Sequence, residues 1–245
     1  LFILPFFLVS ASAGQTADKY ERNKIAKFLK IIEFALMLLA AGAVYFNFYY
    51  FLIFILFLMS VQSAFFGPIK YSVLPQHLKE HELIEGNAYI DGATFFSILA
   101  GTILGTQISS PLMIAGVLVL CSFIGMTASF FIPSAPAPRP DLKINYNIFK
   151  DIKLTLKKIS EMKSIYITIL GLSWFWALGA VILTLLYPMC SDVLGLSQNA
   201  VAVFMLIFSV GMAAGSLVCS KIMRGIVHPT FVPVSSLGIA FTAFL

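Results

Sequence analysis

The lysines and arginines of this chain occur in only four segments, and long apolar stretches separate those segments. All 16 of these residues lie within residues 14–30, 67–87, 133–163 and 220–229. The apolar stretches between them match or exceed the roughly 20 residues that an α-helix needs to cross the hydrocarbon core of a bilayer. Because 60% of the residues are hydrophobic and 11% are charged, the composition is unlike that of a soluble domain. We expect an all-α, polytopic membrane protein.

The apolar stretches predict six complete membrane spans and two partial ones. Residues 31–66 are too long for one crossing, and Asn47 interrupts them within an aromatic cluster that suits the lipid headgroup zone. Residues 92–138 lack any charged side chain, and Ser109-Ser110-Pro111 divides them. We expect each stretch to form a helical hairpin. The other two complete spans are expected at residues 165–189 and 200–219, and partial spans of a longer protein at 1–13 and 231–245.

The distribution of positive charge predicts the orientation of these spans. Lysine and arginine next to a span are retained on the cytoplasmic side of a membrane. The intervening turns, around Asn47, Ser110 and Asp192, contain neither residue. We therefore expect all four basic segments to be loops that face the cytoplasm. A nucleic-acid surface is disfavoured, because such a site needs basic and aromatic groups on one soluble face, whereas the aromatic residues here lie in the apolar stretches.

The first basic segment carries the pattern G-x-x-x-D-x-x-x-R-x-K, formed by Gly14, Asp18, Arg22 and Lys24. It resembles the signature that major facilitator transporters carry between their second and third helices. A glycine permits close approach of helices, and an aspartate that pairs with a basic group or a helix N-terminus can latch one conformation. The alternative is an ordinary basic loop, which supplies Arg22 and Lys24 but does not require glycine and aspartate at this spacing.

This resemblance implies a fragment of a major facilitator bundle with two six-helix halves, running from the end of helix 2 to the start of helix 9. Residues 1–132 would be the N-terminal half without helix 1 and with part of helix 2. Residues 133–163 would be a cytoplasmic linker, and residues 164–245 would begin the C-terminal half.

Within the linker, apolar residues recur at helical spacing and predict an amphipathic helix that lies at the membrane surface. Lysines between them are suited to anionic lipid headgroups. The apolar residues are Ile148, Phe149, Ile152, Leu156 and Ile159, and the lysines are Lys150, Lys153, Lys157 and Lys158.

A second motif lies between the two predicted hairpins. Its pattern P-x-K-Y-x-x-L-P, followed by L-x-x-x-N, is similar to the segment that joins helices 4 and 5 in bacterial lysophospholipid transporters, including forms fused to an acyltransferase and an acyl-carrier-protein ligase. The residues that carry the resemblance are Pro68, Lys70, Tyr71, Pro75 and Asn87.

The second resemblance implies a secondary transporter that moves lysophospholipid, chiefly of the ethanolamine type, across the bacterial inner membrane for re-acylation. The implied partners are the lipid substrate, the bilayer, and a fused or associated acyltransferase and acyl carrier protein; no cofactor is implied. Stand-alone members carry a basic residue in helix 7 where Leu183 aligns, which favours the fused subgroup. A generic major facilitator efflux transporter remains an alternative, because a fold does not fix a substrate.

Enzymatic chemistry is not expected within these residues. An acyltransferase centre usually contains H-x-x-x-x-D, and neither His77 nor His81 has aspartate at that spacing. No G-x-x-x-x-G-K-[ST] loop for nucleotide binding occurs. Residues 77–81 match the zinc pattern H-x-x-E-H, but this short pattern has no third ligand nearby, so a solvated turn is the better interpretation and no metal site is expected.

Three charged residues within or at the edge of predicted spans are candidates for substrate or ion contact: Glu33, Lys70 and Asp91. Charges in a membrane span are costly and therefore often functional. Lys70 is expected to contact a lipid phosphate, and Asp91 an amine or a coupled cation. The alternative is that Lys70 extends to the aqueous surface and that both carboxylates lie at helix ends near water.

Overall fold

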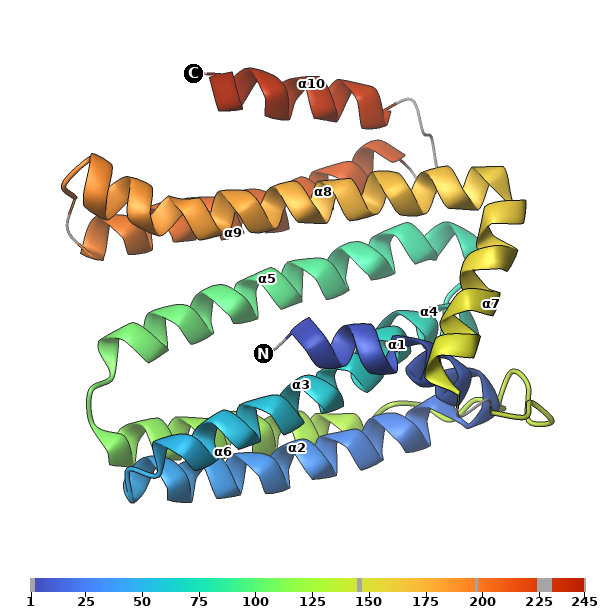
Figure 1. The fold of residues 1–245 in the computed structure, drawn as a ribbon, viewed down its shortest axis with the longest axis horizontal. Helices are drawn as coiled ribbons and strands as arrows, with labels where there is room; N and C mark the ends of the chain where they lie inside the picture. Colours follow the sequence, from blue (N-terminus) through green and yellow to red (C-terminus); the bar gives the residue numbers. More distant parts are fainter. Residues whose placement is uncertain (1–2, 145–146, 197, 224–230, 245) are drawn as a thin grey trace.

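The computed structural model describes residues 3–144, 147–196, 198–223 and 231–244. Long helices run side by side along most of the molecule (Figure 1). In chain order they are α1 (Ile3–Lys19), α2 (Arg22–Tyr45), α3 (Tyr49–Ser72), α5 (Leu83–Gln107), α6 (Pro111–Ser129), α8 (Lys163–Pro188), α9 (Gln198–Met223) and α10 (Phe231–Phe244).

The expected number of membrane spans is confirmed. Among the described residues, six helices are long and apolar enough to cross a membrane, and they belong to α2, α3, α5, α6, α8 and α9. The first and last long helices, α1 and α10, have 17 and 14 residues and are not among these six. The chain is therefore a multi-pass, all-α membrane protein.

Two tight connections form the predicted hairpins. Between α2 and α3, Asn47 adopts a positive φ of 58°, a conformation that asparagine tolerates better than most residues. The amide of Phe48 then donates to the carbonyl of Ala43 at 2.8 Å. Between α5 and α6, Pro111 occupies the start of the second helix, where its missing N–H is not needed. Both breaks thus follow from local backbone chemistry.

Much of the basic segments, which were expected to be loops, is helical. Within residues 14–30, only Tyr20 and Glu21 separate α1 from α2. Residues 67–87 include the end of α3, a short helix α4 (Leu74–His77), a 3₁₀ turn η1 (Glu80–Glu82) and the start of α5. The reason is that hydropathy marks only the lipid-facing part of a helix, whereas backbone hydrogen bonding continues into water. Of residues 220–229, those from 224 onward lie outside the described residues.

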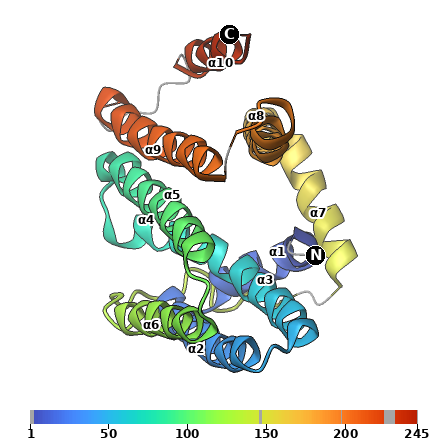
Figure 2. The ribbon, with the colours of Figure 1, turned by 90° about the vertical axis from the view of Figure 1, so that its left-hand side faces the viewer.

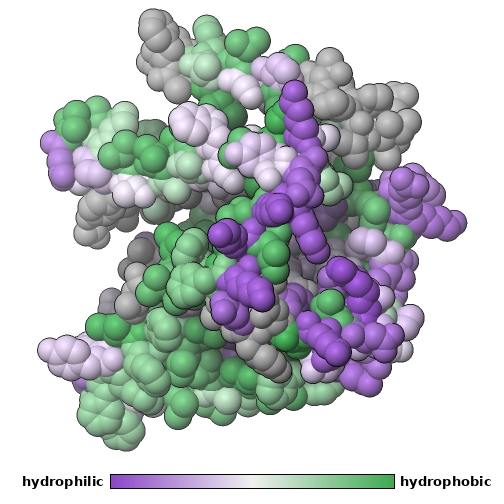
Figure 3. Space-filling view, turned by 45° about the vertical axis from the view of Figure 1, so that its right-hand side comes forward, coloured by the Kyte–Doolittle hydropathy of each residue, from purple (hydrophilic) through white to green (hydrophobic). Residues whose placement is uncertain are grey.

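The predicted amphipathic helix is present as α7 (Ile148–Glu161). It begins after Asn147, whose side-chain oxygen accepts a 3.0 Å hydrogen bond from the amide of Lys150, a normal N-terminal cap. It runs across the ends of the long helices (Figures 1 and 2). Hydrophilic surface gathers over this end of the molecule (Figure 3). The described charges thus concentrate at one end of the bundle, and the compartment that this end faces stays a prediction.

Small residues allow the helices of the first part of the chain to pack closely. One buried cluster joins α1, α2 and α3 through Ala17, Ala26, Leu29 and Ile69. A second, around Ala40 and its neighbours, joins α2 to α3 and α6. Alanine lets helix backbones approach one another, which is the main source of packing energy where the hydrophobic effect is absent. Helices α1, α2, α3 and α6 therefore form one packed group.

Helix α5 packs differently from its neighbours in sequence. It lies along α9 over much of its length and contacts α3 over only a short stretch. Phe95 of α5 also stacks on Trp176 of α8, with ring centroids 6.4 Å apart. Helix α5 is therefore shared between the first packed group and the helices that follow α7 (Figure 2).

A π-helical turn, η2 (Met189–Val193), extends α8 and leads into the connection before α9. Its Cys190 is buried, whereas Cys121 and Cys219 are exposed.

Candidate functional site

The short contact between α3 and α5 carries a group of four polar side chains. Tyr71 of α3 donates its hydroxyl proton to Oδ1 of Asp91 on α5, at 2.7 Å. One residue earlier, Lys70 Nζ donates to Oγ1 of Thr94 at 3.3 Å. Thr94 and Asp91 are one helical turn apart, and so lie on the same face of α5. The structure thus brings together two of the three predicted candidates, Lys70 and Asp91.

The two opposite charges in this group lie close enough to attract one another, but they do not form a direct ion pair. Lys70 Nζ lies 4.8 Å from the centroid of the Tyr71 ring, close enough for a cation–π contact. In the part of the chain that the structure describes, neither Lys70 nor Asp91 forms an ion pair. Both belong to helices that are candidate membrane spans. The group therefore offers one cation and one anion where α5 meets α3, and each forms its hydrogen bond with a neutral partner.

The other residues of the helix 4–5 motif shape the connection beside this group. Pro68 lies inside α3, and Pro75 lies in the first turn of α4. Asn87 is exposed on the second turn of α5. The neighbouring Gly86 lies close to the Leu78 side chain, since a Cβ atom added there would be 2.5 Å from Cδ1 of Leu78. The motif residues thus lie on α3, on α5 and in the connection between these helices.

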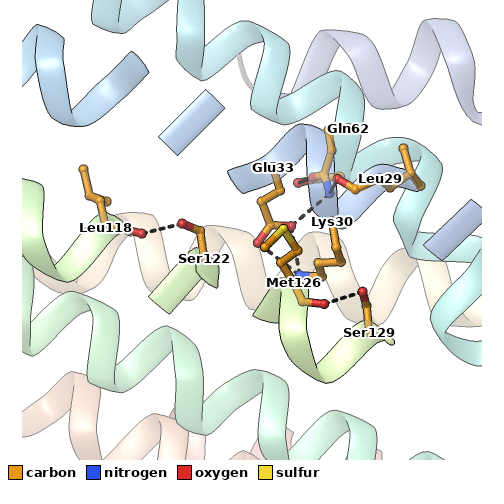
Figure 4. Close-up of polar contacts among 9 residues, drawn as sticks. Leu29, Lys30, Glu33, Gln62, Leu118, Ser122, Met126 and Ser129 are labelled. Atoms are coloured by element: carbon orange, nitrogen blue, oxygen red, sulfur yellow. Dashed lines mark hydrogen bonds and ion pairs between the residues drawn. The ribbon is translucent and has the colours of Figure 1, made fainter. Parts of the chain in front are cut away.

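Glu33, the third candidate, lies in a separate cluster between α2 and α3 (Figure 4). Its carboxylate pairs with Lys30 Nζ, with N–O distances of 2.9 and 3.1 Å. Nε2 of the buried Gln62 donates to the same carboxylate at 2.9 Å, and also contacts the carbonyl of Leu29 at 3.3 Å. Lys30 Nζ lies 4.7 Å from the Phe66 ring centroid as well. Glu33 is therefore a satisfied charge that ties α2 to α3.

The signature residue Asp18 is the centre of a third cluster, at the end where α7 lies. Its carboxylate pairs with Arg139 from the segment after α6, and lies 3.8 Å from Arg22. The backbone carbonyl of Asp18 also accepts a 2.8 Å hydrogen bond from the amide of Arg139. Arg22 in turn donates to the carbonyl of Ser72 at the end of α3, at 2.5 Å. The cluster links the α1–α2 turn to α3 and to the segment 133–147.

Two residues of the signature take no part in that cluster. Lys24 pairs locally with Glu21 at 2.8 Å. A Cβ atom added to Gly14 would meet nothing within 4 Å, so the close approach expected at this glycine is not present in this arrangement of the helices.

The two histidines of the H-x-x-E-H pattern do not lie on one helix. His77 lies on α4 and His81 on η1, with a break between these elements. The described residues contain no group of three or more side chains suited to a metal ion.

Sequence reasoning missed four of the partners in these clusters. Lys30 was counted only as a basic residue of the first segment, although its spacing of three from Glu33 is a signal for a helical ion pair. Gln62 is a polar residue in an apolar stretch, which is also a signal. Thr94 and Arg139 gave none, because their partners come from distant parts of the chain. Leu183 lies on α8, and its side chain is outside the described part of the structure.

Comparisons with known proteins agree with this architecture. The lysophospholipid transporter LplT of Photorhabdus laumondii is 26% identical over 220 residues, which are 88% of this chain and 54% of that protein. The proteins of the same name from Enterobacter sp. strain 638 and Klebsiella pneumoniae are 24% and 25% identical; they align with 91% and 100% of this chain and 56% and 61% of their own length.

The chain thus spans little more than half the length of these curated relatives. No solved structure is significantly similar. The family model of the Major Facilitator Superfamily matches residues 1–245. Together with the six apolar helices, this match shows that the chain belongs to the Major Facilitator Superfamily.

Proposed function

We propose that this chain is part of a secondary transporter that moves lysophospholipid, of the lysophosphatidylethanolamine type, across the bacterial inner membrane. The observation that carries the proposal is a cation and an anion, Lys70 and Asp91, that attract one another without a direct ion pair. Thr94 and Tyr71 hold them where α3 meets α5. The similarity to lysophospholipid transporters supports the same substrate class.

The chemistry of the substrate matches these two charges. A lysophosphatidylethanolamine headgroup carries an anionic phosphate next to a cationic amine, and its single acyl chain requires an apolar surface. Lys70 supplies a charged donor for the phosphate, and Asp91 supplies an acceptor for the amine. Such charges are costly in a membrane span unless they are paired, so a zwitterionic ligand offsets the cost. The exposed apolar surfaces of α5 and α8 are suited to the acyl chain.

The position of the site suits alternating access. Helix α5 packs along α9 but contacts α3 over a short stretch, and two hydrogen bonds at that contact involve the residues proposed to bind substrate. We propose that headgroup binding exchanges these bonds for bonds to the substrate, which loosens α5 from the α1–α2–α3–α6 group. Rocking of one half of the bundle against the other is the usual motion of such transporters.

The proposal includes the division of the chain and its orientation. Residues 1–132 belong to the first half, residues 133–163 form the linker, and residues 164–245 begin the second half. The four basic segments face the cytoplasm, and the Asp18 cluster latches the conformation seen here by joining the first half to the linker through Arg139. Any acyltransferase or ligase activity of a fused or associated protein lies outside these residues, which work without a metal or cofactor.

The experiment uses the full-length protein in lipid vesicles and two variants that remove charge, Lys70→Gln and Asp91→Asn. Uptake of labelled lysophosphatidylethanolamine is compared with uptake of lysophosphatidylglycerol, which has the phosphate but no amine. A hydrogen bond to a charged group contributes roughly 1.5–3 kcal/mol, so its loss lowers uptake roughly tenfold or more. We expect Lys70→Gln to reduce uptake of both lipids, and Asp91→Asn to reduce mainly that of the ethanolamine lipid.

The matched control is Lys79→Gln, which removes a lysine from the same connection but at an exposed position between α4 and η1. It should leave uptake unchanged. Equal uptake by wild type and both site variants would dismiss the assignment of Lys70 and Asp91. Absence of lipid movement by the wild-type protein, with transport of a drug instead, would favour a generic efflux transporter and refute the substrate class.

A further inference from the structure

The amphipathic helix α7 lies at the level where the chain enters the membrane. Its axis runs across the ends of the long helices (Figures 1 and 2), and only Met162 separates it from α8. Helix α8 is a candidate membrane span from its first residue, Lys163. The C-terminal end of α7 is therefore at the boundary between the lipid headgroups and the hydrocarbon core.

The protein covers only part of the apolar face of α7. Phe149, Ile152, Leu156 and Ile159 are spaced by three, four and three residues, which places them on one stripe of the helix. Ile152 and Ile159 are half-buried, and α7 packs against α1 and α8. Phe149 and Leu156, on the same stripe, are 74% and 59% exposed. Part of this apolar stripe thus remains uncovered.

A row of lysines borders the uncovered part. Lys153 and Lys157 follow Phe149 at four and eight residues, so they lie next to it around the helix. Both are exposed. Lys158 is nine residues from Phe149, which at about 100° per residue places it on the opposite side of the helix. The exposed side chains of Phe149 and Leu156 therefore have positive charge along one side. A ligand that covers them can also contact these lysines.

We propose that α7 binds anionic phospholipid of the adjacent leaflet. Phe149 and Leu156 enter the boundary between headgroups and acyl chains, and Lys153 and Lys157 contact the lipid phosphates. Two observations favour lipid over a further protein segment or a second copy of the chain. The helix lies at headgroup level, and its cationic row complements the negative surface of a membrane leaflet. This inference does not depend on what the protein transports.

The test measures how deeply α7 lies in vesicles of defined composition. Single cysteines replace Phe149 or Leu154 in the full-length protein, after Cys121, Cys190 and Cys219 have been replaced, and each carries a spin label. Leu154 is the matched position, because it lies on the same helix about 140° from Phe149. Accessibility to oxygen, which concentrates in lipid, is compared with accessibility to a water-soluble nickel complex.

In vesicles of phosphatidylcholine with phosphatidylglycerol, we expect the label at position 149 to favour oxygen and the label at position 154 to favour nickel. Each lysine near an anionic surface contributes roughly fivefold to membrane binding. Lys153→Gln with Lys157→Gln should therefore lower the ratio of immersed to water-exposed label at position 149 roughly 25-fold. Lys79→Gln with Lys158→Gln, which removes the same charge elsewhere, should leave that ratio nearly unchanged.

Three outcomes would overturn the proposal. A label at position 149 that is open to nickel in every vesicle places the residue in water. A label closed to both reagents shows that protein covers it. Equal immersion in pure phosphatidylcholine and in the anionic mixture, with no effect of the lysine variants, shows that anionic lipid is not recognised.

Discussion

The ion pair between Lys30 and Glu33 offers a sharp test of how charge is held inside this bundle. Their side chains are 20% and 18% exposed, and Nζ lies 2.9 Å from the nearer carboxylate oxygen. We predict that Glu33→Gln destabilises the protein, because it leaves the Lys30 ammonium in a membrane span with only neutral groups, such as the Phe66 ring, near it. Lys30→Gln should destabilise it for the corresponding reason, although Gln62 still donates to Glu33.

The magnitude follows from the burial of the pair. Removing one partner of a fully buried pair costs about 3–5 kcal/mol. Here about one-fifth of each side chain reaches the surface, and neutral partners remain, so we expect about 2 kcal/mol for either single change. The double variant Lys30→Gln with Glu33→Gln leaves no charge behind and should lose less than the sum of the two. The expected coupling energy is about 2 kcal/mol.

The assay is reversible unfolding in detergent micelles, with the free energy of unfolding measured for the wild type, both single variants and the double variant. The matched control is the exposed pair Lys24 and Glu21, which has the same separation of three residues and an N–O distance of 2.8 Å, but with Lys24 72% exposed. Its coupling energy should not exceed about 0.5 kcal/mol. Additivity within about 0.5 kcal/mol for Lys30 and Glu33 would refute the reasoning.

Two further predictions concern the latch and the helix 4–5 connection. Arg22→Gln removes the donor to the Ser72 carbonyl and should destabilise the conformation seen here by about 1–2 kcal/mol. The free energy of unfolding in detergent would fall by that amount, and an unchanged value would count against the latch. Gly86→Ala forces Leu78 to move and should lower the melting temperature, whereas Gly14→Ala, with open space around it, should raise it through a gain of about 0.5–1 kcal/mol in helix propensity. Equal shifts for the two alanine variants would show that the approach of Leu78 to α5 is not a real constraint.

The sequence predicted the number of spans well because a bilayer imposes a strong requirement on length and polarity. Asn47 and Pro111 also marked their turns correctly, since both act through the local backbone. The ends of the helices were less predictable. Residues Arg22 to Lys30 were expected in a loop and are helical, because a helix that leaves the membrane can continue with polar side chains.

The candidate site could be predicted only in part. Lys70 and Asp91 stood out as charges within apolar sequence, but their separation of 21 residues gives no information on whether they lie together. Their arrangement depends on the course of the connection between α3 and α5, which contains α4 and η1. Likewise, Asp18 was recognised from its motif, whereas its partner Arg139 lies 121 residues away. Such a pairing depends on the packing of whole helices, and no local pattern encodes it.

The site, the latch and the proposed lipid contact of α7 all require that the basic end of the bundle lies in one aqueous compartment and the opposite turns in the other. The most direct measurement is labelling of single cysteines by a membrane-impermeant maleimide on intact cells that express the full-length protein. Cysteines in place of Asn47 and Ser110 should react. Cysteines in place of Lys79 and Lys157 should react only after the membrane is opened. Labelling of Lys79→Cys and Lys157→Cys from opposite sides would contradict the account.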